Sequence, residues 1–161
     1  MAELKRIFES LGLKEVETFI ASGNVIFTVK SGRPEALEAK IEKGLLAELG
    51  YEVAVFLRTE QEIQAVSIAS PFSVATAGAA AAFNVAFAKS PLQAGQKEKL
   101  GSFVSDNDEF ASVGREIYWM CKVKQNESRF VSAKMERLLG IRVTWRNLNT
   151  VRRLSAKYPP G

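Results

Sequence analysis

The chain has 161 residues, of which 47% are hydrophobic and 25% charged, with one cysteine, no histidine and a net charge of +4. This length and apolar fraction predict one ordinary globular domain or two small ones and exclude a disordered chain. The missing histidine removes the usual general base and most zinc and iron sites, and the single Cys121 excludes an internal disulfide. No apolar run is long enough for a membrane span. Because the single cysteine forms no internal disulfide, a reducing cytoplasm is the expected compartment, and we expect no metal and no cofactor.

The first half of the chain predicts helix, strand, strand, helix, strand and helix, in that order. Apolar residues at helical spacing predict the first helix, and Ser22, Gly23 and Asn24 form a tight turn between the first two strands. Pro34 opens the second helix, and Thr59 opens the third with the spacing of a capping box. The expected ranges are 1–11, 16–21, 25–29, 34–49, 52–57 and a short helix after Thr59.

The second half repeats this order with one additional strand in front. Residues 73–82 are nearly all alanine and are interpreted as a loop or linker. The order that follows, strand, helix, strand, strand, helix, strand, is that of ferredoxin-like domains, with the first and third strands in the centre of the sheet. The expected ranges are 83–88, 92–103, 110–113, 116–121, 128–139, 141–145 and a last helix capped by Asn147.

Residues recur between the halves as well as elements. Leu57-Arg58-Thr59 recurs 88 residues later as Trp145-Arg146-Asn147. Internal repeats of this kind indicate architecture. We therefore predict an α+β protein of two tandem ferredoxin-like repeats with antiparallel sheets, the first of which lacks its opening strand. The repeats are expected at 1–72 and 83–158, on either side of the Ala-rich linker at 73–82.

Five motifs, in order along the chain, carry a resemblance to a known family. They are Phe19–Phe27, Arg58–Glu60, Pro71–Phe72, Gly114–Tyr118 and Thr144–Val151. The chain resembles the bacterial family called domain of unknown function 1697, which implies tandem ferredoxin-like repeats and a small soluble bacterial protein with no established activity. Family members usually begin with a strand and a Gly-rich loop that are absent here. Their Ser-Lys ahead of a helix is similar to Ser128-Arg129.

The missing opening strand has a physical consequence for the first repeat. It leaves the strands at 25–29 and 53–57 with unpaired edges, and unpaired edges recruit other strands. Three outcomes stay open: a homodimer through this gap, direct pairing of the two strands, or a chain that starts upstream of Met1.

The candidate binding residues gather on one predicted face of the second repeat. Alternation places Phe83, Val85, Phe87, Ile117, Trp119 and Cys121 under the helices, and Asn84, Glu116, Tyr118, Arg142, Thr144 and Arg146 on the other face. Arg58 and Arg146 each end a strand just before a capped helix N-terminus, a geometry that suits a phosphate or carboxylate. The alternative, that these arginines pair with nearby glutamates, stays open. The candidate ligand-binding set is Arg58, Arg115, Tyr118, Arg129, Arg146 and Asn147, with no metal ligands.

Other polar residues have structural interpretations. Cys121 is expected to be a buried structural thiol, as most free cysteines are. Lys122 cannot easily activate it, because neighbouring residues of a strand point to opposite faces. Asp108, in an acidic cluster, is interpreted as part of a solvated loop. The Ser22-Gly23-Asn24 turn is explained by backbone conformation alone.

Three functions remain open at this point. The first is a non-enzymatic binding module for a small anionic or phosphorylated ligand or for a nucleic-acid backbone. The second is an enzyme without histidine or metal that acts on a phosphorylated or acidic substrate, with Lys134 or Tyr118 as proton carrier. The third is an interaction subunit that associates through the open strand edge. Charge favours an anionic partner, because residues 122–161 hold 10 basic and 2 acidic side chains.

Overall fold

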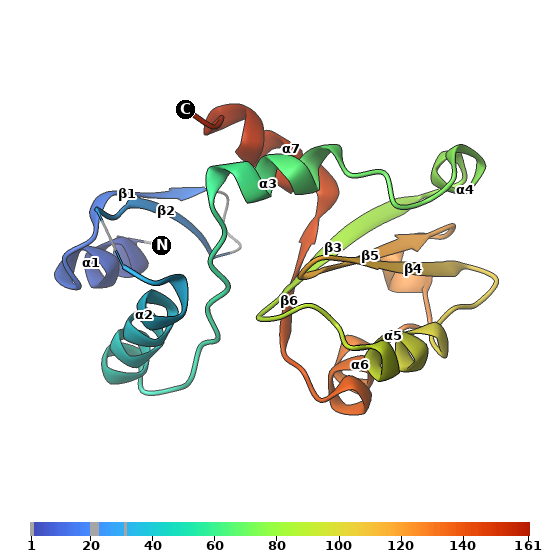
Figure 1. Cartoon of the computed structure of the whole chain (residues 1–161), viewed down its shortest axis with the longest axis horizontal. Coiled ribbons are helices and arrows are strands. Elements are labelled where there is room, and N and C mark those ends of the chain that lie inside the picture. Colours follow the sequence, from blue (N-terminus) through green and yellow to red (C-terminus); the bar gives the residue numbers. More distant parts are fainter. Residues whose placement is uncertain (1, 20–22, 31) are drawn as a thin grey trace. The chain divides into compact units, whose positions relative to one another are not determined.

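The computed structural model describes residues 2–19, 23–30 and 32–161 of the chain (Figure 1). Its described residues form an α+β protein with seven α-helices and two antiparallel sheets. The chain divides into two compact units, Met1–Leu57 and Arg58–Gly161. The boundary between these two compact units falls before helix α3 (Glu60–Ile68). No helix among the described residues is both long and apolar enough to cross a lipid bilayer.

The first unit is built from α1 (Ala2–Ser10), β1 (Lys14–Phe19), β2 (Asn24–Thr28) and α2 (Pro34–Leu49). β1 and β2 pair as an antiparallel hairpin, as the sequence predicts. The buried residues of this unit form one core cluster: Ile7, Phe8, Leu13, Val16, Ile41 and Leu45. In the hairpin turn Gly23 has a φ of 79°, which only glycine adopts easily, and the Asn24 amide donates to the Phe19 carbonyl at 3.1 Å. Ser22 lies outside the described residues.

The strand predicted at 52–57 is not formed. Val53, Val55 and Leu57 do pack against the core of the first unit, so their alternation is real. However, the N–H of Val55 donates to Glu42 Oε2 at 2.9 Å, and the N–H of Leu57 donates to Glu38 Oε2 at 2.7 Å. N–H groups two residues apart point to the same edge of an extended chain, and glutamates four residues apart share one face of a helix. Two carboxylates of α2 thus stand where a neighbouring strand would otherwise bond.

Direct pairing of the segment 53–57 with β2 is also wrong for the described residues. The sheet of the first unit contains β1 and β2 only, within the part of the chain that the structure describes. A β-strand forms only where a neighbouring strand pairs with it. In the ferredoxin-like order the neighbour of the segment 52–57 is the opening strand, and the predicted first repeat has none.

The second unit has the predicted strand–helix–strand–strand–helix–strand order. Its elements are α3, α4 (Val74–Gly78), β3 (Ala82–Ala88), α5 (Ala94–Gly101), β4 (Asp108–Val113), β5 (Glu116–Cys121), the short 3-10 helix η1 (Gln125–Glu127), α6 (Ser132–Leu139), β6 (Val143–Asn147) and α7 (Leu148–Lys157). The four strands lie in the order β4-β5-β3-β6, and every neighbouring pair is antiparallel. The first and third strands of the unit, β3 and β5, are therefore central, as predicted.

Helices cover both faces of this sheet. Figure 1 shows α5 and α6 on one side of the sheet and α3 and α7 on the other. Val66 of α3 and Leu148 and Val151 of α7 are all buried. The central strands β3 and β5 are consequently buried along most of their length. The sequence prediction of one open sheet face is wrong, because it did not place α3 and α7 over that face.

The two faces of β3 are also the reverse of the prediction. Residues directly opposite each other on neighbouring strands share a face, and Ala86 is opposite Ile117 and Asn84 opposite Trp119. Ala86 and Ile117 belong to the core under α5 and α6. Phe83, Val85 and Phe87 therefore lie on the other face, together with Tyr118, and Asn84 lies inside the α5/α6 core. Both faces of β3 are apolar enough to be buried, so the sequence pattern alone does not decide which alternate residues face α5 and α6.

The Ala-rich segment contains helix α4, which the sequence analysis interpreted as loop. Ser73 caps this helix, since its hydroxyl accepts the N–H of Thr76 at 3.1 Å. Alanine is the best helix former, so one cap suffices to start a short helix here.

The carboxylate contacts of the first unit give a testable prediction. Replacing Glu38 with Ala is expected to lower the free energy of unfolding by about 1–3 kcal/mol, because the Leu57 N–H loses this buried acceptor. Glu38→Gln keeps an acceptor oxygen and should cost clearly less. Urea denaturation followed by circular dichroism measures both variants, and equal losses for Ala and Gln would contradict the role of this hydrogen bond.

Candidate functional site

Arg58, the first residue of the second unit, is a buried structural anchor. Its side chain is 2% exposed. The guanidinium donates from Nε to Glu116 Oε2 at 2.9 Å and from Nη2 to the Ala88 carbonyl at 2.7 Å, and it lies over the Phe87 ring at 5.2 Å. Burial lowers the pKa of Arg58, and the bond and charge of Glu116 oppose that shift. The alternative of an arginine paired with a glutamate is thus the one that the structure favours.

Arg115 is likewise paired, with Glu62 of α3. Glu62 also accepts the Thr59 N–H at 2.9 Å and closes the predicted capping box of α3. Burial raises the pKa of Glu62, but the bonds from Thr59 and Arg115 outweigh it and the pKa lies below its ordinary value. Arg58, Arg115, Glu62 and Glu116 therefore form one network that holds the start of α3 against the β4–β5 turn.

Arg146 lies on the same sheet face as Phe87. Thr144 is directly opposite Phe87, and Arg146, two residues further along β6, points to the same face as Thr144. Its guanidinium donates to Thr144 Oγ1 at 2.7 Å and to the Trp145 carbonyl at 2.8 Å. Burial lowers its pKa. The two arginines predicted as equivalent anion sites are thus both committed to bonds within the fold.

Tyr118 is 1% exposed and packs edge to face on Phe83, with ring centroids 6.3 Å apart. Burial, with a smaller contribution from the charge of Glu116, raises the pKa of Tyr118 to about 12. A phenol in this position keeps its proton and does not meet solvent. The structure therefore places Tyr118 in the core and not on an open ligand-binding face.

The remaining candidates, Arg129 and Asn147, are exposed. Arg129 lies three residues before α6. Asn147 ends β6 and caps α7 as predicted, since its Oδ1 accepts the Asn149 N–H at 2.8 Å. Asn147 also lines a hollow in the surface.

Asp108, interpreted from sequence as part of a solvated loop, is instead 3% exposed at the start of β4. Its Oδ1 accepts from Trp119 Nε1 at 2.8 Å and Ser128 Oγ at 2.8 Å. Cys121 Sγ and Ser105 Oγ complete the set of donors. Ser128 also accepts the Phe130 N–H, so this serine turns the chain ahead of α6 and the helix starts later than predicted. Cys121 is a buried thiol, as predicted, and burial followed by the Asp108 contact raises its pKa to about 12.

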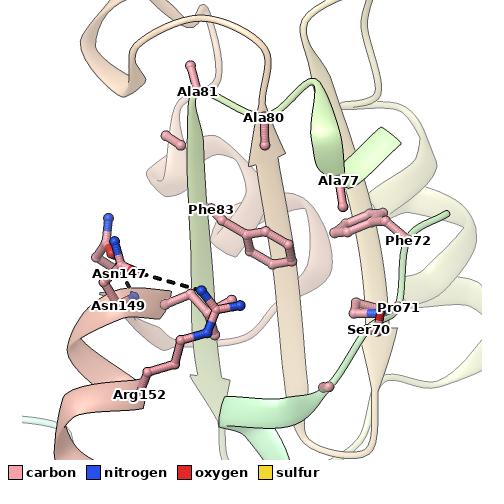
Figure 2. Close-up of a pocket in the computed structure, with 13 residues that line it drawn as sticks. Ser70, Pro71, Phe72, Ala77, Ala80, Ala81, Phe83, Asn147, Asn149 and Arg152 are labelled. Atoms are coloured by element: carbon pink, nitrogen blue, oxygen red, sulfur yellow. Dashed lines mark hydrogen bonds between the residues drawn. The ribbon is translucent and has the colours of Figure 1, made fainter. Parts of the chain in front are cut away.

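A hollow of about 350 Å³ lies where β6 passes into α7. Figure 2 shows Asn147, Asn149 and Arg152 on one side of it and the rings of Phe72 and Phe83 on the other. The two rings meet edge to face, with centroids 5.5 Å apart. The other lining residues are mostly small: Ala69, Ser70, Pro71, Ala77, Ala80, Ala81, Ala82 and Leu148. A hollow of this size is at the lower end of what small-molecule sites occupy.

Arg152 is the functional candidate that sequence reasoning missed. It is exposed, and the structure gives its guanidinium one contact, a 3.4 Å hydrogen bond to Asn149 Oδ1. The arginines predicted first lie at strand ends, whereas Arg152 lies one turn inside a helix. The available signal was the predicted cap at Asn147, because Arg152 lies near the start of the helix that this residue caps.

The described residues contain no group of three Cys, Asp or Glu side chains that could hold a metal ion. The chemistry of the hollow is therefore that of a cation, two amides and apolar walls.

Comparison with known proteins identifies the family. The model of a family described as protein of unknown function (DUF1697) matches residues 1–118. The chain belongs to the DUF1697 family. This DUF1697 protein is also similar to the solved structure of the conserved bacterial protein SP0830 from Streptococcus pneumoniae, with a TM-score of 0.71 and 22% identity over 97% of this chain and 87% of that one. The likeness shows a shared fold. No curated protein matches the DUF1697 chain.

The arginine network of the DUF1697 protein leads to a stability prediction. Replacing Arg58 with Met is expected to cost about 3–5 kcal/mol of unfolding free energy, because Glu116 is left largely buried without its partner. The double variant Arg58→Met/Glu116→Gln should recover part of this loss. Arg129→Met, at an exposed position, is the matched control and should be near neutral. Urea denaturation gives all three values, and a loss for Arg58→Met no larger than that for Arg129→Met would refute the anchor.

Asp108 gives a prediction on pH. Burial raises its pKa, but the bonds from Trp119, Ser128, Ser105 and Cys121 lower it below the ordinary value of 3.8. A lowered carboxyl pKa contributes stability that is present above the unfolded-state pKa and is lost as pH falls through the folded-state pKa. The stability difference between the native protein and Asp108→Asn should thus be largest above about pH 4 and shrink in more acidic solution. Denaturation curves across pH measure this, and a constant difference would contradict it.

Proposed function

We propose that this DUF1697 protein is a non-enzymatic binding module, and that the hollow at the start of α7 binds a small anionic molecule with an apolar body. The observation that carries the proposal is Arg152, an exposed cation that makes no ion pair with a described acidic residue and borders the hollow. A guanidinium in that situation is available to a carboxylate or phosphate, and such bonds are among the strong ones in proteins.

The polar and apolar walls suit the two ends of such a ligand. Asn147 and Asn149 stand at the N-terminus of α7, where free N–H groups and the helix dipole favour negative charge. Phe72 and Phe83 face them across the hollow, as Figure 2 shows, and offer ring surfaces to an apolar or planar group. A simple inorganic anion would contact only the polar wall at the start of α7.

The arginines predicted at the strand ends contribute in a different way. Arg58 and Arg115 hold α3 on the sheet, and Arg146 is bonded to β6 itself. We infer that they support the face from which α7 projects and that they do not contact the ligand.

We further infer that the first unit is a ferredoxin-like repeat without its opening strand. The strand order β4-β5-β3-β6 of the second unit supports this, as does the recurrence of Leu57-Arg58-Thr59 at the end of β6. Pairing of two copies through the edge of β2 stays a prediction of that arrangement. A cytoplasmic location is likewise a proposal, and the single buried Cys121 supports it.

The enzyme alternative receives less support. One of its two proton carriers, Tyr118, lies in the core with a pKa of about 12, and the other, Lys134, is exposed on α6 and does not line the α7 hollow. A general acid or base must reach a bound substrate.

Titration with phenyl phosphate tests the proposal. Backbone amide resonances of Asn149 and Arg152 should shift on titration. Arg152→Ala should raise the dissociation constant about tenfold or more, because one charge-assisted hydrogen bond is lost. Arg153→Ala changes the same charge on the same helix outside the lining and should leave the affinity unchanged. Inorganic phosphate and phenol, the two halves of the probe, should each bind more weakly than phenyl phosphate. Resonance shifts confined to other elements, or equal effects of the two variants, would overturn the proposal.

A further inference from the structure

Helix α6 and the residues that flank it carry a second concentration of positive charge, away from the α7 hollow. Its members are Arg129, Lys134, Arg137 and Arg142, and all four side chains are exposed. None of them makes an ion pair or a side-chain hydrogen bond with another described residue. The only acidic residues from 122 to 142 are Glu127 and Glu136.

The packing of α6 turns this charge outward. Met135 and Leu139 are buried against the sheet, and the Gln96 amide of α5 bonds to the Leu139 carbonyl at 2.9 Å. Lys134 and Arg137, three residues apart, are neighbours on the helix surface that the buried pair leaves exposed. One carboxylate oxygen of Glu136 accepts the Val143 N–H at 2.9 Å, so this acidic residue is tied to the start of β6.

Arg137 and Arg142 also share a hollow. It measures about 420 Å³ and is lined by Ala133, Glu136, Arg137, Gly140, Ile141 and Arg142. Gly140 ends α6 in the left-handed conformation, with a φ of 68°, and this turn brings the chain of Arg142 back beside the helix. Two guanidiniums around one recess form a receptor for a phosphate group.

We propose that this surface, Arg129, Lys134, Arg137 and Arg142, binds the phosphate backbone of a nucleic-acid duplex. The chemistry favours a duplex over a single strand. Single-strand binding uses aromatic rings on which bases stack. The rings next to α6 include Phe103, Phe130 and Trp145, and each packs edge to face on another ring. A surface of four cations without exposed rings contacts the phosphate groups and not the bases. The binding should therefore not depend on the nucleotide sequence of the duplex.

Two other arginines of the unit are already paired with carboxylates and are therefore less suited to bind a phosphate backbone. Arg58 and Arg115 are neutralised by Glu116 and Glu62 on the α3/α7 side. Of the ten basic residues from 122 to 161, four belong to the α6 surface. The surface does not include Arg152, so this proposal and the small-ligand proposal stand or fall separately.

Fluorescence anisotropy with a short labelled DNA duplex of mixed sequence is the experiment. Affinity should fall as salt rises between roughly 50 and 200 mM, with a slope of log K against log salt that reports the number of phosphate contacts. The variant Arg137→Gln/Arg142→Gln should weaken binding at least tenfold and reduce the magnitude of that slope by about 2, since each contact contributes about 0.9.

The matched control is Lys40→Gln/Lys43→Gln, which removes the same charge from exposed positions of α2 in the first unit. It should leave both affinity and slope nearly unchanged. A native protein that does not bind the duplex, equal losses for the two double variants, or a slope that Arg137→Gln/Arg142→Gln leaves unchanged would overturn the proposal. Tighter binding to the matching single strand, or binding to phosphatidylserine vesicles without binding to duplex, would overturn it as well. The Arg152→Ala variant should bind duplex like the native protein.

Discussion

The arrangement of the second unit depends on one buried cation. Arg58 stands at the first residue of the unit, and its guanidinium bonds at once to a carboxylate of β5 and to the last carbonyl of β3. A charge taken out of water is tolerated only when it is paired and fully hydrogen-bonded, so few positions of the chain around Arg58 satisfy it. Since α3 begins two residues later, this requirement also directs α3 onto the sheet. The burial of Tyr118 and Val66 on that face follows from it.

Covering the sheet on both faces moves the candidate functional surfaces to its periphery. A ferredoxin-like sheet with one bare face can bind ligands on exposed aromatic residues. Here α3 and α7 occupy that face, and its rings become core. What stays accessible are the places where elements end: the start of α7, with Asn147 and Arg152, and the outside of α6. Both proposals concern such places, one through a mixed polar and apolar hollow and the other through charge alone.

The sequence predicted best where the deciding interactions are local. The capping box of Thr59 and Glu62, the Asn147 cap and the glycine ends of α2 and α6 were all predictable, because each joins residues within one turn of a helix. The strand at 52–57 failed for the opposite reason. Its alternation was real and its apolar side chains pack on the core, but the N–H groups of Val55 and Leu57 bond to glutamates of α2. The phase of β3 failed because both of its faces are apolar, and only the register with β5 and β6 decides between them.

By itself the sequence determined the order of elements in the second unit from β3 onward, the α+β class, the family and the excess of positive charge in the last part of the chain. It did not determine which cations are available. Arg58 pairs with Glu116 and Arg115 with Glu62, partners 58 and 53 residues away. Pairing over such separations depends on how strands and helices pack, and no local pattern encodes it. Only the tertiary structure therefore decided that the arginines at the strand ends are bonded within the fold, whereas Arg152, Arg137 and Arg142 are exposed.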